Sequence, residues 1–257
     1  MRLQALPAFD DNYIWAWIGD GGRALIVDPG QAEPVLAAAG QGLVPEAVLL
    51  THHHGDHIGG VPELLARWPE LPVLAPDDER IDAATARIGG GDTGELLGRS
   101  FEVLAIPGHT RSHIAFHFKG DDPLLFCGDT LFSLGCGRMF EGTPAQMLAS
   151  LDRLAALPGG VRVCCGHEYT LANARFAAAV EPGNAALAAR SAEAAALREQ
   201  GRPILPSTLA QERAANPFLR VDEPAVKATI AQRLGREPEG RIETFAELRL
   251  WKDGFRA

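Results

Sequence analysis

Short hydrophobic runs alternate with glycine-rich turns along the chain up to about residue 167. Runs of this length that are bounded by turn residues predict strands. We expect strands at residues 13–18, 24–28, 46–51, 101–106, 113–118, 124–127 and 161–165. The first two flank the turn Gly19-Asp20-Gly21-Gly22, which predicts a β-hairpin.

Helical patterns are fewer in this part of the chain. Residues 34–39 and 60–67 predict short helices. Thr143 begins a longer helix, because its hydroxyl can cap the first turn and Gln146 can complete a capping box. One side of that helix carries the expected core residues Met147, Leu148, Leu151 and Leu154.

The pattern changes after residue 167, where Ala-rich helical periodicity takes over. This change predicts a catalytic domain over residues 1–167 and a helical domain over residues 168–257. Near the end of the chain, Thr244-Phe245-Ala246-Glu247 predicts another capping box and the start of the last helix.

Charge and composition limit the partners of the chain. Hydrophobic residues make up 46% of the 257 residues and charged residues 22%, as in ordinary globular proteins. The net charge of -9 does not favour nucleic acid or an anionic membrane, and no apolar run approaches the ~20 residues of a membrane span. The N-terminal segment lacks the organisation of a signal peptide, and the four cysteines fit a reducing compartment. We therefore expect a cytoplasmic protein that binds a small molecule.

Histidines are concentrated in a way that indicates metal binding. Four of the eight lie within residues 52–57, directly after a predicted strand. Donors of the metal-binding type follow this strand and three later ones, at His52, His54, Asp56, His57, His109, Asp129 and His167. Imidazole and carboxylate groups suit Zn²⁺, Fe or Mn²⁺. The set is too large for one four- or five-coordinate ion, so it predicts two ions that share a bridging carboxylate.

Other residues near this motif are expected to have supporting roles. His53 does not match a ligand position and is expected to face away, as a hydrogen-bonding neighbour of the ligands. His113 is expected to support the site or the fold rather than to bind metal, and His117 to be a surface or core residue. Asp28 closes a strand before a Pro-Gly turn, which favours a turn-stabilising role over direct ligation.

Several motifs together resemble a known family. THHHGDHIGG (51–60), with the donors upstream and downstream of it, looks like the metal motif of the metallo-β-lactamase fold superfamily. The whole chain resembles glyoxalase II, the hydroxyacylglutathione hydrolases, in FDDNYIW (9–15), PGHTRSHI (107–114), CGDTLF (127–132), EGTPAQM (141–147), CGHEYTLAN (165–173), EPGN (181–184) and NPFLR (216–220). The resemblance implies an α+β fold, in which a four-layer αββα metallo-β-lactamase sandwich is followed by a small all-helical C-terminal domain.

The resemblance assigns the donors to two metal ions. It implies a first ion held by His52, His54 and His109. It implies a second ion held by Asp56, His57 and His167. Asp129 would bridge both ions, together with a hydroxide whose formation at neutral pH the ions promote, and Asp56 and Asp129 would be the catalytic carboxylates. Zn²⁺ is the favoured metal, Fe and Mn²⁺ also fit, and the family suggests a monomer.

The resemblance also implies which residues bind glutathione. Arg249 and Lys252 correspond to contacts with a glutathione carboxylate, and they lie three residues apart on one helix face. Their spacing alone would favour a solvated surface, and only the resemblance gives them this role.

Three more positions complete the implied substrate site. Arg138 stands where the family usually has a lysine that contacts the glycyl end, and Tyr169 matches a substrate-binding tyrosine. Phe140 stands where the family commonly has a tyrosine, which removes one hydrogen bond worth about 0.5–1.5 kcal/mol.

Thioester hydrolysis of S-(2-hydroxyacyl)glutathione is therefore the leading prediction, with S-D-lactoylglutathione as the substrate and glutathione and D-lactate as the products. The leaving thiolate has a pKa of about 8.5 and needs little acid assistance, so a Ser or Cys nucleophile is not required. Persulfide dioxygenation at a single iron is a second interpretation, against which the NPFLR motif and the basic pair argue. A third is a non-catalytic metal-binding module. A β-lactamase would need export, and a nuclease would need a basic surface.

Overall fold

The computed structural model describes residues 1–256. They form two compact units: Met1–Ala105 with Ser112–Gly128, and Ile106–Arg111 with the residues from Asp129 onward. The units interleave along the sequence, and the predicted domain boundary after residue 167 stays a prediction. None of the helices within residues 1–256 is long and apolar enough to cross a membrane.

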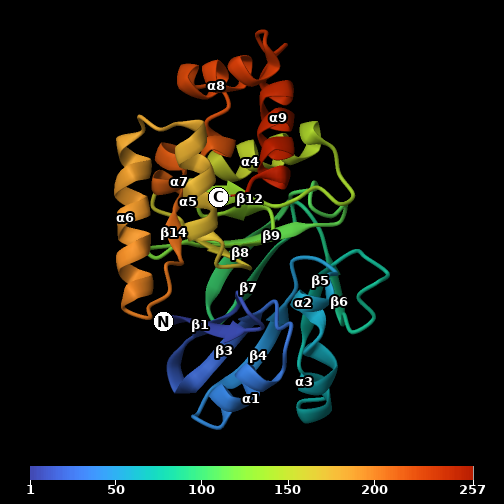
Figure 1. Cartoon of the computed structure of the whole chain (residues 1–257). Helices are drawn as coiled ribbons and strands as arrows, with labels where there is room; N and C mark the ends of the chain where they lie inside the picture. Colours follow the sequence, from blue (N-terminus) through green and yellow to red (C-terminus); the bar gives the residue numbers. More distant parts are fainter. Residues whose placement is uncertain (257) are drawn as a thin grey trace. The chain divides into compact units, whose positions relative to one another are not determined.

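The first unit contains a six-stranded sheet in the order β1-β2-β3-β4-β5-β6 (Figure 1). Its strands are β1 (Arg2–Ala8), β2 (Asn12–Ile18), β3 (Arg23–Val27), β4 (Val44–Leu49), β5 (Val73–Pro76) and β6 (Ala86–Ile88). The predicted hairpin is β2–β3, which is antiparallel, whereas the pairs from β3 to β6 are parallel. The helical segments of this unit are η1 (Asp20–Gly22), α1 (Glu33–Ala39), α2 (Gly55–Ile58) and α3 (Val61–Arg67).

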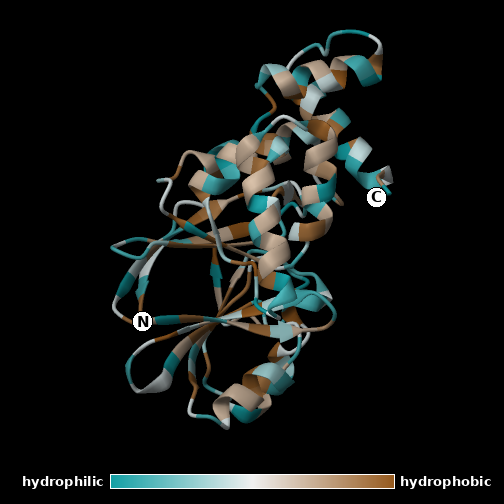
Figure 2. Cartoon of the chain, turned by 60° about the vertical axis from the view of Figure 1, so that its left-hand side comes forward, coloured by the Kyte–Doolittle hydropathy of each residue, from teal (hydrophilic) through white to brown (hydrophobic). Residues whose placement is uncertain are grey.

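A second layer of antiparallel strands completes this unit. These strands are β7 (Thr93–Leu96), β8 (Arg99–Ala105), β9 (Ile114–Phe118) and β10 (Leu124–Gly128). Trp17 of β2 meets Phe118 of β9 edge to face, with ring centroids 4.9 Å apart, so the two layers pack as a sandwich. Figure 2 shows hydrophobic positions running along the strands, as expected for sheets that bury a face against each other.

The second unit is mainly helical. Its strands are the short pairs β11 (Leu131–Phe132) with β12 (Gly135–Cys136), and β13 (Arg162–Cys165) with β14 (Ser207–Thr208). Its helices are α4 (Pro144–Ala155), α5 (Thr170–Val180), α6 (Ala185–Glu199), α7 (Leu209–Ala215), η2 (Pro217–Leu219), α8 (Pro224–Leu234) and α9 (Arg241–Gly254). The apolar stripe predicted on α4 is buried, which confirms that it is core.

The two predicted capping boxes have different outcomes. At α4 the prediction is confirmed, because the Gln146 amide donates to Thr143 Oγ1 at 3.3 Å and the Thr143 amide donates to Gln146 Oε1 at 3.0 Å. At Thr244 it is wrong, because α9 begins a turn earlier, with Gly240 as its N-cap. The Thr244 hydroxyl is inside the helix, where it donates to the Gly240 carbonyl at 3.0 Å instead of capping.

Candidate metal centre

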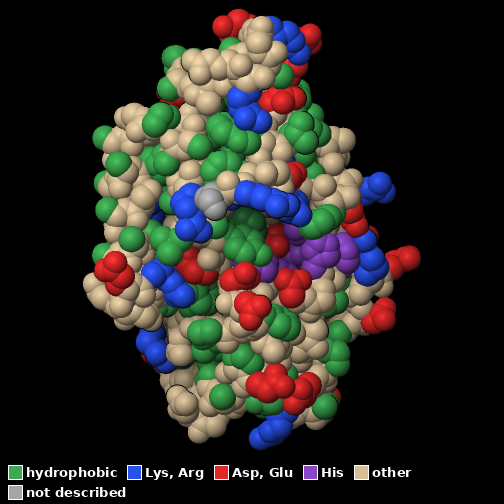
Figure 3. Space-filling view, in the orientation of Figure 1, with side chains coloured by type: hydrophobic (Ala, Val, Ile, Leu, Met, Phe, Trp, Pro, Cys, Tyr) green, Lys and Arg blue, Asp and Glu red, His purple; other side chains and the backbone are tan. Residues whose placement is uncertain are grey.

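The loop that follows β4 presents donors of the first unit. His52 Nε2 and His54 Nδ1 lie 3.1 Å apart, and the His52 ring is buried. Helix α2 begins directly after His54 and carries Asp56 and His57 in its single turn. Figure 3 shows imidazole gathered in one patch of the visible face, and only His53 and His54 among the eight histidines are more than slightly exposed. Two imidazole nitrogens this close are the arrangement of ligands to one cation.

Asp28 organises this loop from the end of β3. Its carboxylate accepts from the Thr51 amide at 2.8 Å and from Thr51 Oγ1 at 2.7 Å. It lies 3.0 Å from His57 Nδ1, so that nitrogen donates its proton and Nε2 is left with the lone pair a metal needs. Asn12 Nδ2 donates to Asp56 Oδ2 at 3.0 Å and so fixes that carboxylate. These contacts agree with a supporting role for Asp28, which stays a prediction.

The other histidines of this unit also have partners within the protein. His53 Nδ1 lies 3.4 Å from Asp78 Oδ2. The His113 ring stacks on the His52 ring at a centroid distance of 4.6 Å and an angle of 16°. His117 is buried and pairs with Glu102 at 2.9 Å, and this bond holds the pKa of the Glu102 carboxyl below its usual range. None of these contacts contradicts the predictions that His53 and His113 have supporting roles and that His117 is a surface or core residue.

Three donors belong to the second unit, and all three are buried. Asp129 follows β10, His167 follows β13, and His109 lies in the segment Ile106–Arg111. Asp129 Oδ2 is 3.5 Å from His109 Nε2 and 3.3 Å from His167 Nε2. His109 Nδ1 lies 2.7 Å from the Arg138 carbonyl, so it donates there and the lone pair that a cation would need is on Nε2. The donor chemistry of both units therefore fits a divalent cation.

A cavity of about 460 Å³ in the second unit, named here the basic pocket, contains every predicted substrate residue of this chain. Its lining includes His109, Asp129, Arg138, Phe140, Tyr169, Arg249 and Lys252. The Tyr169 ring stacks on the His167 ring at 4.8 Å. Phe140 is 64% exposed and meets the His109 ring edge to face at 5.2 Å. Side chains of the metal-binding type and cationic groups thus line the same cavity.

The two arginines of the basic pocket share one carboxylate. Arg249 is buried, with Nη1 donating to the Cys136 carbonyl at 2.7 Å and Nη2 to Asp253 Oδ1 at 3.0 Å. Arg138 Nε lies 3.2 Å from the same Asp253 oxygen, and its side chain is mostly exposed. Sequence reasoning missed Asp253, although its place four residues after Arg249 is a signal for a helical ion pair. The solvated-surface interpretation of Arg249 is wrong, because the side chain is buried.

Burial shifts the pKa values of two ionisable groups in the basic pocket. It lowers the pKa of Lys252 to about 8, with further lowering from the charges of Arg249 and Arg175. It raises the pKa of the Cys136 thiol to about 11, although Arg249 opposes the shift. Cys136 is therefore a protonated thiol at neutral pH and a poor nucleophile.

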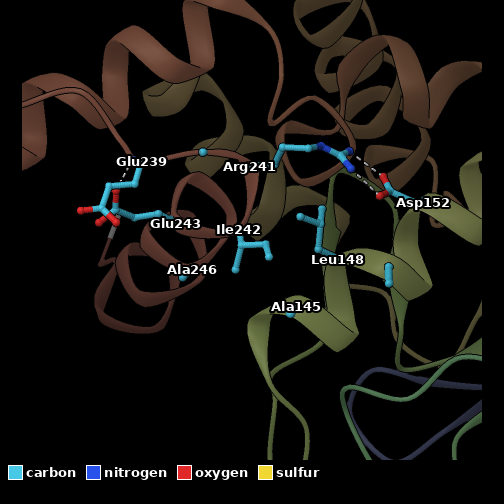
Figure 4. A pocket seen from close by; sticks show the side chains of 10 residues that line it. Ala145, Leu148, Asp152, Glu239, Arg241, Ile242, Glu243 and Ala246 are labelled. Carbon is cyan, nitrogen blue, oxygen red and sulfur yellow. Dashed lines mark hydrogen bonds and ion pairs between the residues drawn. The ribbon is translucent and has the colours of Figure 1, made fainter.

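A second cavity, of about 580 Å³, lies beside the start of α9 (Figure 4). Arg241 and Asp152 form an ion pair across 2.8 Å at its wall, and the rest of the described lining is largely apolar. It has no histidine among those lining residues and none of the predicted site residues, so the candidate chemistry belongs to the basic pocket.

Comparison with known proteins decides the family. Residues 11–167 match the metallo-beta-lactamase superfamily model, and residues 168–255 match the model for the hydroxyacylglutathione hydrolase C-terminus. The hydroxyacylglutathione hydrolase of Xanthomonas euvesicatoria pv. vesicatoria (strain 85-10) is 63% identical over 258 residues, covering 100% of both chains. The chain belongs to the hydroxyacylglutathione hydrolase family. This membership confirms the family predicted from the sequence.

Solved structures agree with the fold of the hydroxyacylglutathione hydrolase family. The BLEG-1 B3 metallo-beta-lactamase has a TM-score of 0.65 at 23% identity, covering 85% of this chain and 99% of its own. TTHA1623, solved in a di-iron-bound form, has a TM-score of 0.58 at 27% identity, covering 85% of this chain and 100% of its own. The predicted α+β fold, a metallo-β-lactamase fold with a helical C-terminal domain, is therefore confirmed.

Proposed function

We propose that this protein hydrolyses the thioester of S-(2-hydroxyacyl)glutathione, with S-D-lactoylglutathione as its substrate and glutathione and D-lactate as its products. One observation carries the proposal: the basic pocket contains metal-type donors and the cations Arg138 and Lys252 in a single cavity. The relatives of 60% identity and more that bear the name hydroxyacylglutathione hydrolase support it over the full chain.

The proposal includes two divalent ions, with Zn²⁺ favoured over Fe and Mn²⁺. The first would be held by His52, His54 and His109. The second would be held by Asp56, His57 and His167. Asp129 would be a ligand of both ions. Its position supports this, because its Oδ2 lies within 3.5 Å of His109, assigned to the first ion, and of His167, assigned to the second. Such ions would lower the pKa of a water and polarise the thioester carbonyl.

The residues of the chain would bind and orient the substrate. Arg138 and Lys252 would attract the carboxylates of glutathione, which the net charge of -9 would otherwise repel. Arg249 already donates through Nη1 to the Cys136 carbonyl and through Nη2 to Asp253, so we propose that it acts on the substrate mainly by fixing the shape of the basic pocket. Tyr169 would supply a hydroxyl beside His167, and Phe140 an apolar contact at the rim.

Hydrolysis can be tested directly by following the loss of the thioester absorbance of S-D-lactoylglutathione. Turnover that releases glutathione and D-lactate would support the proposal. Oxygen consumption on glutathione persulfide, without thioester cleavage, would support the dioxygenase interpretation instead. Bound metal with neither activity would indicate a non-catalytic metal-binding module.

Lys252 gives a prediction for the pH dependence of substrate binding. A lysine binds a carboxylate as a cation, and burial lowers the pKa of this one to about 8. Its contribution to binding is therefore present below that pH and is lost as the pH rises through it, so KM should increase. Lys252→Gln should raise KM about tenfold at neutral pH, the effect of one charge-assisted hydrogen bond, with kcat changed less than about twofold.

The ratio of variant KM to wild-type KM removes the titration of the substrate from this test. That ratio should fall toward one between about pH 7 and pH 9, because the wild type then loses the same charge. Lys227→Gln is the control, since Lys227 lies on α8 and pairs with Asp222 at 3.5 Å. A ratio that stays constant with pH would contradict a carboxylate contact by Lys252.

A cytoplasmic location and a monomeric state also belong to the proposal. The four cysteines are buried and none of them forms a disulfide, which supports a reducing compartment. Sedimentation of the purified protein would test the monomer.

A further inference from the structure

The β11–β12 hairpin connects the two sides of the basic pocket. It begins two residues after Asp129 and ends two residues before Arg138. At its tip, Leu134 has a φ of +58°, a left-handed conformation that is uncommon for a residue with a branched side chain. A hairpin of two residues per strand cannot hold such a shape alone, so its surroundings must hold it.

Buried polar side chains from the helices hold the hairpin backbone. Glu212 of α7 accepts from the Leu134 amide at 2.8 Å. Asn216, which follows α7, donates through Nδ2 to the Phe132 carbonyl at 3.1 Å and to the Gly135 carbonyl at 2.9 Å. Glu212 and Asn216 are fully buried, and Asn216 Nδ2 also donates to Glu212 Oε2 at 3.2 Å. We name these two residues the hairpin clamp.

Two further side chains hold the tip of the hairpin. Asn173 of α5 donates to the Ser133 carbonyl at 3.0 Å, and Arg190 of α6 donates to Ser133 Oγ at 3.4 Å. β12 packs against α5 and η2, and Figure 1 labels β12 and α5. Three successive helices therefore direct polar groups to one short hairpin.

The hairpin in turn contacts the metal donors of its own unit. The Gly137 amide donates to the Thr130 carbonyl at 3.1 Å. A Cβ at Gly137 would lie 1.8 Å from the Asp129 carbonyl oxygen, so the residues that flank the two strands leave no free space there. The Arg138 carbonyl, at the end of this segment, accepts from His109 Nδ1 and fixes the orientation of that ring. A shift of the hairpin would therefore move both Asp129 and the acceptor of His109.

We propose that Glu212 and Asn216 are positioning residues for the metal centre, which act through the β11–β12 hairpin on Asp129 and His109. The proposal rests on the proposed function, because it concerns the same donors. It also gives a physical role to the NPFLR motif, whose first residue is Asn216. The last residue of that motif, Arg220, instead pairs with Glu181 at 2.8 Å and holds the pKa of the Glu181 carboxyl below its usual range.

The test compares two asparagines of the helical part by substituting each with alanine. Asn216→Ala removes the donor to the hairpin. Asn184→Ala is the matched control, because Asn184 Nδ2 also donates to a carboxylate and a carbonyl, Glu181 and Ala214, but contacts no residue of the hairpin in the described structure. Affinity is measured with Zn²⁺ as the probe, by competition with a chelator, at a temperature where circular dichroism shows both variants to be folded.

Asn216→Ala should weaken Zn²⁺ binding about 10–100-fold, the range for residues that support metal ligands. Asn184→Ala should bind within about twofold of the wild type, even where its Tm is lower. Equal affinities for Asn216→Ala and the wild type would overturn the positioning role of the hairpin clamp and leave the proposed function intact. A wild type that takes up no Zn²⁺ would overturn the proposed function and the clamp with it.

A second pair of variants covers the case in which Asn216→Ala does not fold. Glu212→Gln keeps an oxygen that can accept from the Leu134 amide, and it should retain Zn²⁺ affinity within about threefold. Glu212→Ser removes that acceptor while keeping a small polar group, and it should lose affinity about tenfold or more. Equal affinities for these two variants would overturn the clamp.

Discussion

Removal of bound metal is expected to reduce hydrolysis of S-D-lactoylglutathione by at least about 1,000-fold, because activation of water and polarisation of the carbonyl each contribute several kcal/mol. The basic pocket offers little to replace the ions. Among its described lining residues, only Cys136 and Tyr169 carry a thiol or hydroxyl group. Burial raises the pKa of Cys136 to about 11, so its thiolate is scarce at neutral pH.

The measurement is an absorbance assay on protein dialysed against a chelator, with metal content determined on the same sample. Addition of Zn²⁺, Mn²⁺ or Fe²⁺ should restore turnover, since His and Asp donors accept all three. Circular dichroism of the stripped protein serves as the control for folding. Full turnover by folded, metal-free protein would show that the proposed mechanism is wrong.

The parts of the fold that depend on nearby residues could be predicted from the sequence. Thr143 and Gln146 form their capping box because every partner lies within one turn. The box at Thr244 failed because a competing local bond, to the Gly240 carbonyl, was equally close in sequence. β1 was not predicted, since its sequence RLQALPA is partly exposed and becomes a strand through its pairing with β2. Pairing of this kind is set by tertiary contacts.

In the candidate site, too, features set by neighbouring residues could be predicted, whereas contacts between distant residues could not. The spacing of His52, His54 and His57 identified donors, because the motif itself forms the loop and the helical turn. Contacts between residues that are far apart in the sequence could not be predicted from the motif. Arg249 is separated by 113 residues from Cys136, whose carbonyl it holds, and a helical face alone does not reveal such a partner. The carboxylate of Asp253, shared by two arginines, likewise emerges only in three dimensions.

Replacement of Asp129 by alanine is expected to lower metal content at both proposed ions and to reduce kcat about 1,000-fold or more, since the activation that the ions provide would be lost. The physical reason lies in the geometry of one oxygen. Asp129 Oδ2 is 3.5 Å from His109 Nε2 and 3.3 Å from His167 Nε2, and these nitrogens are assigned to different ions. Without the carboxylate, two sets of neutral imidazoles and one remaining carboxylate, Asp56, would have to hold four positive charges.

His167→Ala is the informative comparison for this substitution, because His167 is assigned to one ion only. Metal analysis after gel filtration should find about one ion retained in His167→Ala and less than one in Asp129→Ala, against two in the wild type. Thermal unfolding in the presence of excess chelator separates this effect from lost stability, since both variants are then compared without metal. If Asp129→Ala retained two ions with unchanged turnover, Asp129 could not be a shared ligand. Loss of a single ion in both variants would place Asp129 at one ion alone.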